Sequence, residues 1–219
     1  MEELENRNVL SKTFFLMFLG LLGTGLVAFY TYSSGLYLSI FTSVSALPIL
    51  ALVEFVIVIV LYLCFKKLPP AVVGILYFVY AFLNGFTFSS IFAFYEISSI
   101  MYVFLLTSIL YAVLAFCGYK TNIDVSKWST ILFVALIVSL IASFVNLFLG
   151  NKIINIVICW IFVFFFAGYT IYDTHILREL SRDPSINQDK AYIYCAMQLY
   201  LDFINLFIRL LTIFGKHKD

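Results

Sequence analysis

Residues 153–177 read IINIVICWIFVFFFAGYTIYDTHIL, a long apolar run that only isolated polar side chains interrupt. A helix of about 20 residues crosses the roughly 30 Å hydrocarbon core of a bilayer. Similar runs recur along the chain, and polar breaks divide it into apolar segments near 13–35, 44–65, 71–95, 99–119, 128–149, 153–177 and 191–214. Because a helix satisfies its own backbone in lipid, we predict an all-α integral membrane protein with seven transmembrane helices.

The composition agrees with this interpretation. Of 219 residues, 63% are hydrophobic and 11% charged, whereas a soluble domain is about half apolar and about a quarter charged. These values argue against a soluble enzyme, and a net charge of +1 offers no basic field for nucleic acid. The short loops predict one domain over 13–214, between an N-terminal tail at 1–12 and a polar C-terminal tail at 215–219. All four cysteines lie in apolar runs without metal-ligand spacing, so we expect inert thiols and no cofactor.

Basic residues in the loops indicate the orientation. The N-terminal tail and the second, fourth and sixth links carry nine Lys or Arg residues, whereas the alternate links carry only Lys152. The positive-inside rule therefore places the N-terminus in the cytoplasm. Seven full crossings would put the basic tail GKHKD outside, against that rule. The last segment either enters and returns on the same side, or the first six helices outweigh the tail.

Charged groups inside apolar segments are costly in lipid and often mark function. Four qualify: Glu54, Asp173, Asp202 and Arg209. The last segment adds a stripe at helical spacing, which contains Gln198, Asp202, Asn205, Arg209 and Thr212, and the fifth segment repeats it weakly with Asn146. Such polar residues either bond neighbouring helices together or line a wet cavity. Glu96 and His175 lie near segment ends, where we expect solvated positions.

Hairpin register predicts that two of these carboxyl groups meet. The sixth and seventh segments run antiparallel, and the midpoint between Asp173 and Asp202 falls inside the turn DPSINQ. This register requires the sixth helix to continue for about a turn past Arg178. Two facing carboxylates in a low dielectric cannot both stay ionised cheaply, so we expect them to share a proton. The deprotonated pair, helped by Glu54, would bind calcium weakly and transiently, as a permeation site does. The alternative is a protonated pair that only locks two helices.

The segments GYTIYDTHIL at 168–177 and LYLDFINLFIRLLTIFG at 199–215 resemble the signature stretches of the transmembrane Bax inhibitor motif family. NGFTFSSIFAFY in the third segment and KTNIDVSKW in the fourth link also fit its pattern. The resemblance implies six helices around a central C-terminal seventh. It also implies a pH-sensitive calcium leak in which Asp173 and Asp202 sense protons, and the short tails favour the prokaryotic branch and a bacterial cytoplasmic membrane.

The sequence departs from the family pattern at two places. Family members carry an arginine on the second helix that latches onto the aspartates when the pore is closed, and this chain has none there. Only Lys66 or Lys67, at the end of that helix, can replace it, and a lysine lacks the bidentate geometry of arginine. His175 stands where many relatives carry glutamine.

Two other functions stay open. Paired aspartates on membrane helices are also the machinery of an intramembrane aspartyl protease, but Asp202 lies in Leu-Tyr-Leu-Asp rather than in a Gly-x-Gly-Asp motif. A non-transporting modulator of another membrane protein, such as a protease or cell-death regulator, would present a docking face that looks like any apolar helix. The expected partners are the lipid bilayer, calcium ions, protons and, under that alternative, a membrane protein; we expect no enzymatic activity.

Overall fold

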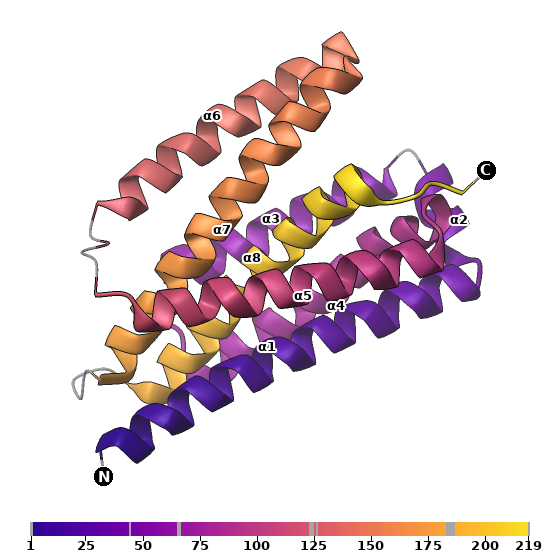
Figure 1. Cartoon of the computed structure of the whole chain (residues 1–219). Helices are drawn as coiled ribbons and strands as arrows, with labels where there is room; N and C mark the ends of the chain where they lie inside the picture. Colours follow the sequence, from indigo (N-terminus) through magenta and orange to yellow (C-terminus); the bar gives the residue numbers. More distant parts are fainter. Residues whose placement is uncertain are drawn as a thin grey trace. The chain divides into compact units, whose positions relative to one another are not determined.

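The computed structural model describes residues 2–43, 45–64, 67–122, 125, 127–182 and 187–218. Within these ranges the chain is helical and forms no β-strand, apart from one isolated bridge between Tyr95 and His217. The helices are α1 (Glu2–Ser33), α2 (Leu36–Thr42), α3 (Ala46–Cys64), α4 (Pro70–Phe94), α5 (Ile97–Lys120), α6 (Trp128–Leu149), α7 (Lys152–Arg182) and α8 (Gln188–Phe214) (Figure 1). The predicted all-α class is confirmed. The sequence prediction missed the short helix α2, and α1 begins within the segment 1–12 that was predicted to be a tail.

Six helices, α1 and α4–α8, are long and apolar enough to cross a membrane, whereas the described apolar stretch of α3, Pro48–Leu61, is shorter. Large apolar side chains cover the outer faces of several helices: Phe148, Phe164 and Leu63 are 76%, 72% and 70% exposed. Such a surface is unfavourable in water and suited to lipid.

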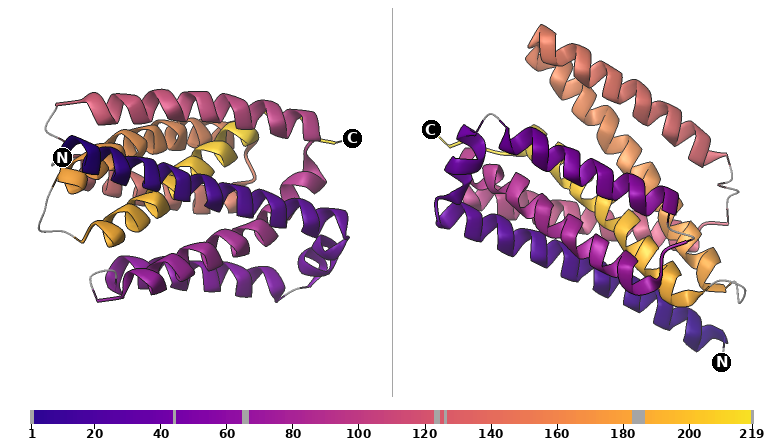
Figure 2. Two further views of the ribbon diagram at one scale, coloured as in Figure 1. Left: turned by 90° about the horizontal axis from the view of Figure 1, so that it is seen from below. Right: turned by 180° about the vertical axis from the view of Figure 1, so that it is seen from behind.

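Local sequence explains where several helices begin and end. Pro70 stands at the first position of α4, where its missing N–H costs no hydrogen bond. Gly35 and Gly150 have φ angles of 76° and 62°, a left-handed conformation that favours glycine. Gly150 ends α6 by donating its N–H to the Asn146 carbonyl over 2.8 Å, and Gly35 allows the chain to turn from α1 into α2 (Figure 2).

The chain divides into two compact units. The first comprises residues 1–97, 180–200 and 217–219, and the second comprises residues 98–179 and 201–216. In the first unit, α1 and α4 lie side by side and run in the same direction. Tyr77 donates to the Leu16 carbonyl (3.1 Å), and Thr24 donates to the Ala81 carbonyl (2.8 Å). In the sequence, α3 lies between α1 and α4, so it carries the chain from the end of α1 back to the start of α4.

The first half of α8 and the C-terminal tail both belong to the first unit. Near the start of α8, the Lys12 ammonium of α1 lies 5.4 Å from the centre of the Tyr192 ring. The tail instead meets the opposite ends of α1 and α4, because Lys218 donates to the Tyr32 hydroxyl (2.9 Å) and to the Phe92 carbonyl (2.7 Å). The segment between them belongs to one continuous helix, α8.

The second unit contains most of α5, α6 and α7 and the last half of α8. The rings of Phe104 and Tyr111 on α5 each lie 5.4 Å from the ring of Phe203 on α8. Gly168 of α7 packs against Leu132 of α6. These contacts place three helices around the middle of α7, where the predicted site residue Asp173 lies.

Candidate functional site

Asp173 of α7 and Asp202 of α8 meet in the second unit, where their carboxyl groups lie within reach of a hydrogen bond to each other. Asp202 is only 4% exposed, and its Oδ2 atom is buried without a hydrogen-bond partner. Ionised carboxylates only accept hydrogen bonds, so a bond between two of these groups requires a proton on one of them. A hydrogen bond within the aspartate pair (Asp173 and Asp202) would therefore need one shared proton.

Two further contacts between α7 and α8 give the register of this hairpin. The Arg209 guanidinium lies 4.2 Å from the centre of the Phe162 ring, and the Trp160 and Phe214 rings are 5.9 Å apart. The midpoints of these pairs and of the aspartate pair all fall between residues 185 and 188. The register deduced from the turn is thus confirmed, although residues 183–186 of that turn lie outside the described residues. As this register requires, α7 extends past Arg178, to Arg182.

The residues of the polar stripe of α8 have different kinds of partner along the helix. Asn205 and Thr212 donate to carbonyls of their own helix, those of Leu201 (2.8 Å) and Ile208 (2.9 Å). Arg209 rests on an aromatic ring and not on a carboxylate. Gln198 is half-buried on the first-unit part of α8. Within this stripe, Asp202 differs because its side chain faces another ionisable group, Asp173 of α7.

The other predicted site residues do not join the aspartate pair in what the structure describes. Glu54, on α3 in the first unit, accepts a 2.8 Å hydrogen bond from Thr87 of α4. Asn146 is buried near the end of α6. Lys67 is exposed in the turn after α3, and Lys66 lies outside the described residues. A lysine latch therefore stays a prediction.

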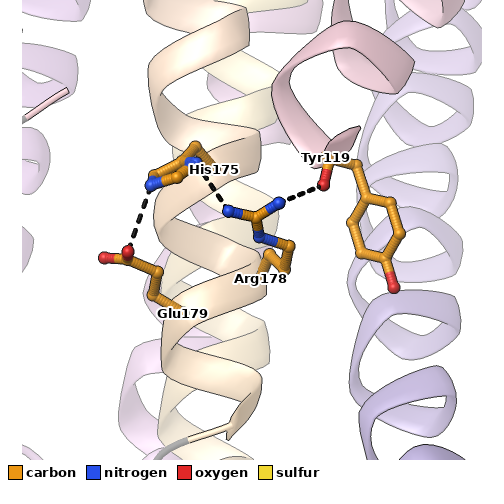
Figure 3. A network of polar contacts seen from close by, with 4 residues as sticks. All are labelled: Tyr119, His175, Arg178 and Glu179. Carbon is orange, nitrogen blue, oxygen red and sulfur yellow. Dashed lines mark hydrogen bonds and ion pairs between the residues drawn. The ribbon is translucent and has the colours of Figure 1, made fainter. Parts of the chain in front are cut away.

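A second polar cluster lies two to six residues after Asp173 along α7 and includes Tyr119 of α5 (Figure 3). Arg178 donates from Nη1 to the Tyr119 carbonyl of α5 over 2.7 Å and from Nη2 to Nδ1 of His175 over 3.2 Å. Nε2 of His175 lies 3.1 Å from Oε1 of Glu179. His175 is 5% exposed, so the expectation of a solvated position was wrong. The reason is that α7 continues for two turns beyond His175, which is therefore not at the helix end.

Sequence reasoning also missed a buried hydroxyl cluster in the first unit. The Tyr200 hydroxyl of α8 lies 2.7 Å from Oγ1 of Thr24 on α1, and the Tyr77 ring packs edge-on against the Tyr200 ring. Tyrosine and threonine are common in apolar helices, and nothing in their spacing indicates a partner 176 positions away. The cluster ties α1, α4 and α8 together.

Among the described residues, no group of three or more His, Cys, Asp or Glu side chains could hold a metal ion. The aspartate pair supplies two carboxyl groups, whereas calcium prefers six to eight oxygen ligands.

Comparison with known proteins identifies the family. The profile described as "Inhibitor of apoptosis-promoting Bax1" matches residues 6–219. The chain is 38% identical to the inner membrane protein YbhL of Escherichia coli over 92% of this chain and 88% of that protein. It is 33% identical to a protein of Deinococcus radiodurans, over 97% and 92% of the two chains, and 34% identical to a membrane protein of Streptococcus pyogenes, over 76% and 73%.

These relatives, together with the six long apolar helices, make this a multi-pass integral membrane protein. The resemblance deduced from the two signature stretches, which contain Asp173 and Asp202, is confirmed over nearly the whole length. The chain belongs to the Bax inhibitor family, described as inhibitors of apoptosis-promoting Bax1.

Proposed function

We propose that this protein is a pH-sensitive calcium leak channel, gated by the protonation of Asp173 and Asp202. The observation that carries the proposal is that these two carboxyl groups, on neighbouring apolar helices, lie within reach of a hydrogen bond to each other. Interhelical adhesion needs no ionisable group, since serine, threonine and asparagine serve that purpose in membrane helices. A carboxyl pair adds a state that depends on proton concentration.

The shared proton explains how the gate would work. With one proton, the pair is joined by a hydrogen bond and holds α7 against α8. Without it, two negative charges face each other, and at about 4 Å and an effective dielectric constant near 20 their repulsion is about 4 kcal/mol. That energy is comparable to several interhelical contacts, so loss of the proton favours separation of the two helices. Once the helices separate, the two carboxylates become accessible and attract cations.

Calcium is the proposed cargo because it is a hard cation that binds carboxylate oxygens. Conduction requires binding that is strong enough for entry and weak enough for release. A pair of aspartates, which supplies few of the oxygen ligands that calcium prefers, fits that requirement. The participation of Glu54 in the pathway stays part of the proposal.

The proposal includes seven membrane crossings with the N-terminus in the cytoplasm. The parallel packing of α1 and α4 supports a crossing by α3, which must return the chain from the end of α1 to the start of α4. The position of Lys218 at the far end of α1 supports a full crossing by α8. A central place for α8 is supported by its burial: 56% of its most apolar stretch is buried, against 11–33% for the other spans. The excess of basic residues in the alternate loops supports the orientation.

The test is calcium flux into liposomes that contain the purified protein and a trapped calcium dye, measured from about pH 5 to pH 8. We expect flux to rise with pH. Asp173→Asn and Asp202→Asn each remove one titrating group and should abolish the pH response. The control is Asp189→Asn, which removes an exposed carboxylate from the first turn of α8. A pH response that survives both pair substitutions would refute the gating role.

A second function is favoured by the same geometry. Two facing aspartates can divide acid and base roles in peptide hydrolysis. Cleavage of a membrane-anchored reporter that either pair substitution abolishes would support an aspartyl protease instead. Flux that appears in cells but not in pure liposomes would support a modulator that acts on another membrane protein.

A further inference from the structure

Two contacts dock α7 onto α5 on either side of Asp173. Two residues before it, the backbone of Ile171 packs directly on Gly118 of α5, so closely that a Cβ atom at position 118 would come within 2.9 Å of the Ile171 Cα. Five residues after it, Arg178 bonds the Tyr119 carbonyl over 2.7 Å. Asp173 therefore lies in a segment of α7 that α5 holds at both ends.

The Arg178 contact is well suited to fix a helix end. Tyr119 is the penultimate residue of α5, and carbonyl groups in the last turn of a helix have no partner within that helix. The negative end of the helix dipole also favours a cation there. Arg178 is only 9% exposed, so little water competes for this bond.

His175 holds the guanidinium of Arg178 in place (Figure 3). Arginine can only donate, so Nδ1 of His175, 3.2 Å from Nη2, accepts this hydrogen bond. The proton of the neutral imidazole then lies on Nε2, which donates to Glu179 over 3.1 Å. The planar guanidinium is thus bound at two of its nitrogen atoms, one by α5 and one by α7.

We propose that Arg178 is a positioning residue for the aspartate pair: it docks α7 on α5 and thereby keeps Asp173 at a fixed height opposite Asp202. This inference rests on the proposed function for its gating consequence. The docking itself is a separate structural statement and can be tested without calcium.

Other charged groups in the second unit bear on the pH readout. The described residues of the second unit hold these other titratable or charged side chains: Tyr102, Tyr111, Cys117, Tyr119 and Lys120 on α5, Lys127 before α6, Lys152, Cys159, Tyr169, Tyr172, His175 and Glu179 on α7, Arg209 on α8 and Lys216 after it. The helix α6 carries no charged side chain between 128 and 149. Arg178→Gln leaves all of these in place. A change in the pH dependence of Arg178→Gln therefore has two possible sources: a shifted position of Asp173 and the loss of one cation. Arg178→Lys restores the cation and so separates the two.

The functional test compares Arg178→Gln and Arg178→Lys with the wild type in the liposome assay. The control is Arg182→Gln, which removes an exposed arginine from the last residue of α7. With α7 loosened, the hydrogen bond of the aspartate pair forms less readily, so the leak should open at lower pH. We expect Arg178→Gln to lower the pH midpoint by about half a unit, which is about a threefold rise in flux on the acidic side. Arg178→Lys, which keeps a cation that can donate to Tyr119 but lacks the planar, fixed geometry of the guanidinium, should fall between Arg178→Gln and the wild type.

The structural test is hydrogen–deuterium exchange of the same proteins in nanodiscs at acidic and alkaline pH, corrected for intrinsic rates. In the wild type, residues 174–179 should stay protected at both pH values. Arg178→Gln should exchange several-fold faster in residues 174–179. A wild type without any leak would refute the proposed function, yet this measurement would still decide the docking. A pH-dependent leak with unchanged midpoint and exchange in Arg178→Gln would overturn the inference and leave the proposed function intact.

Discussion

At the scale of single residues, two buried hydroxyl groups of the first unit, those of Thr24 and Tyr200, are paired across helices. Thr24 is 3% exposed, and its hydroxyl lies within 3 Å of the Ala81 carbonyl and of the Tyr200 hydroxyl. Tyr200 is fully buried and packs edge-on against the rings of Tyr77 and Tyr80. A buried hydroxyl without a partner costs free energy, so these pairings stabilise one arrangement of α1, α4 and α8.

We expect Tyr200→Phe to lower the free energy of unfolding by about 0.5–1.5 kcal/mol, because the ring contacts stay and one hydrogen bond is lost. Reversible unfolding in mixed micelles measures this change. Tyr30→Phe is the matched control, since Tyr30 is 65% exposed on α1. Equal losses in the two variants would contradict the assigned bond.

Some residues with interhelical contacts could be predicted from the sequence, whereas others could not. Asp173 and Asp202 are recognisable because an ionised group inside an apolar helix is costly and needs a reason. Thr24 and Tyr200 carry no such signal, because hydroxyl groups are tolerated in membrane helices. His175 was misplaced because the apolar run ends near it, whereas the helix continues to Arg182.

At the scale of helices, glycine determines how closely neighbours approach. A Cβ atom at Gly85 of α4 would lie 2.6 Å from the Cβ of Val27 and 2.9 Å from the carbonyl oxygen of Thr24. Both obstacles are rigid, one a backbone atom and the other the branch point of a valine. A Cβ at Gly25, also on α1, would meet nothing within 4 Å.

Gly85→Ala should therefore destabilise the protein by about 1–3 kcal/mol, because α1 and α4 must move apart. Gly25→Ala should be neutral or stabilising by up to about 1 kcal/mol, since alanine is the better helix former. Thermal unfolding of the two variants in the same detergent compares them directly. A larger loss in Gly25→Ala than in Gly85→Ala would contradict the described packing of these helices.

Helix register was predictable because a hairpin has few degrees of freedom. Once the turn near 183–188 was recognised, equal distance from it paired Asp173 with Asp202, and the Phe162–Arg209 contact follows the same register. The docking of α5 on α7 was not predictable. It depends on Gly118 and on the backbone carbonyl of Tyr119. Every residue has a backbone carbonyl, and a glycine that packs against a neighbouring helix looks the same in the sequence as one that does not.

At the scale of the whole molecule, the seven crossings that we propose place the two ends of the chain on opposite sides of the membrane. Alkaline phosphatase fused after residue 219 should be active in a bacterial host, because the tail lies outside. The same reporter inserted in the link between α7 and α8 should be inactive, because that link is cytoplasmic. Activity in the link but not at the C-terminus would reverse the orientation, and equal activity at both sites would contradict a full crossing by α8.

The all-helical membrane class could be predicted from apolar run lengths, since about 20 apolar residues are needed to cross a bilayer. The way in which the helices surround one another could not be, because lipid-facing and buried apolar side chains look alike in sequence. Only α8 shows its environment in advance, through a polar stripe that cannot face lipid.

The central claim is that loss of one proton separates Asp173 from Asp202. Structures of the protein in lipid, determined near pH 5 and near pH 8, measure the distance between the two carboxyl groups directly. We predict hydrogen-bonding distance at the acidic pH and separated carboxyl groups at the alkaline pH. Carboxyl groups that stay in contact at both pH values, or that are apart at both, would contradict the account.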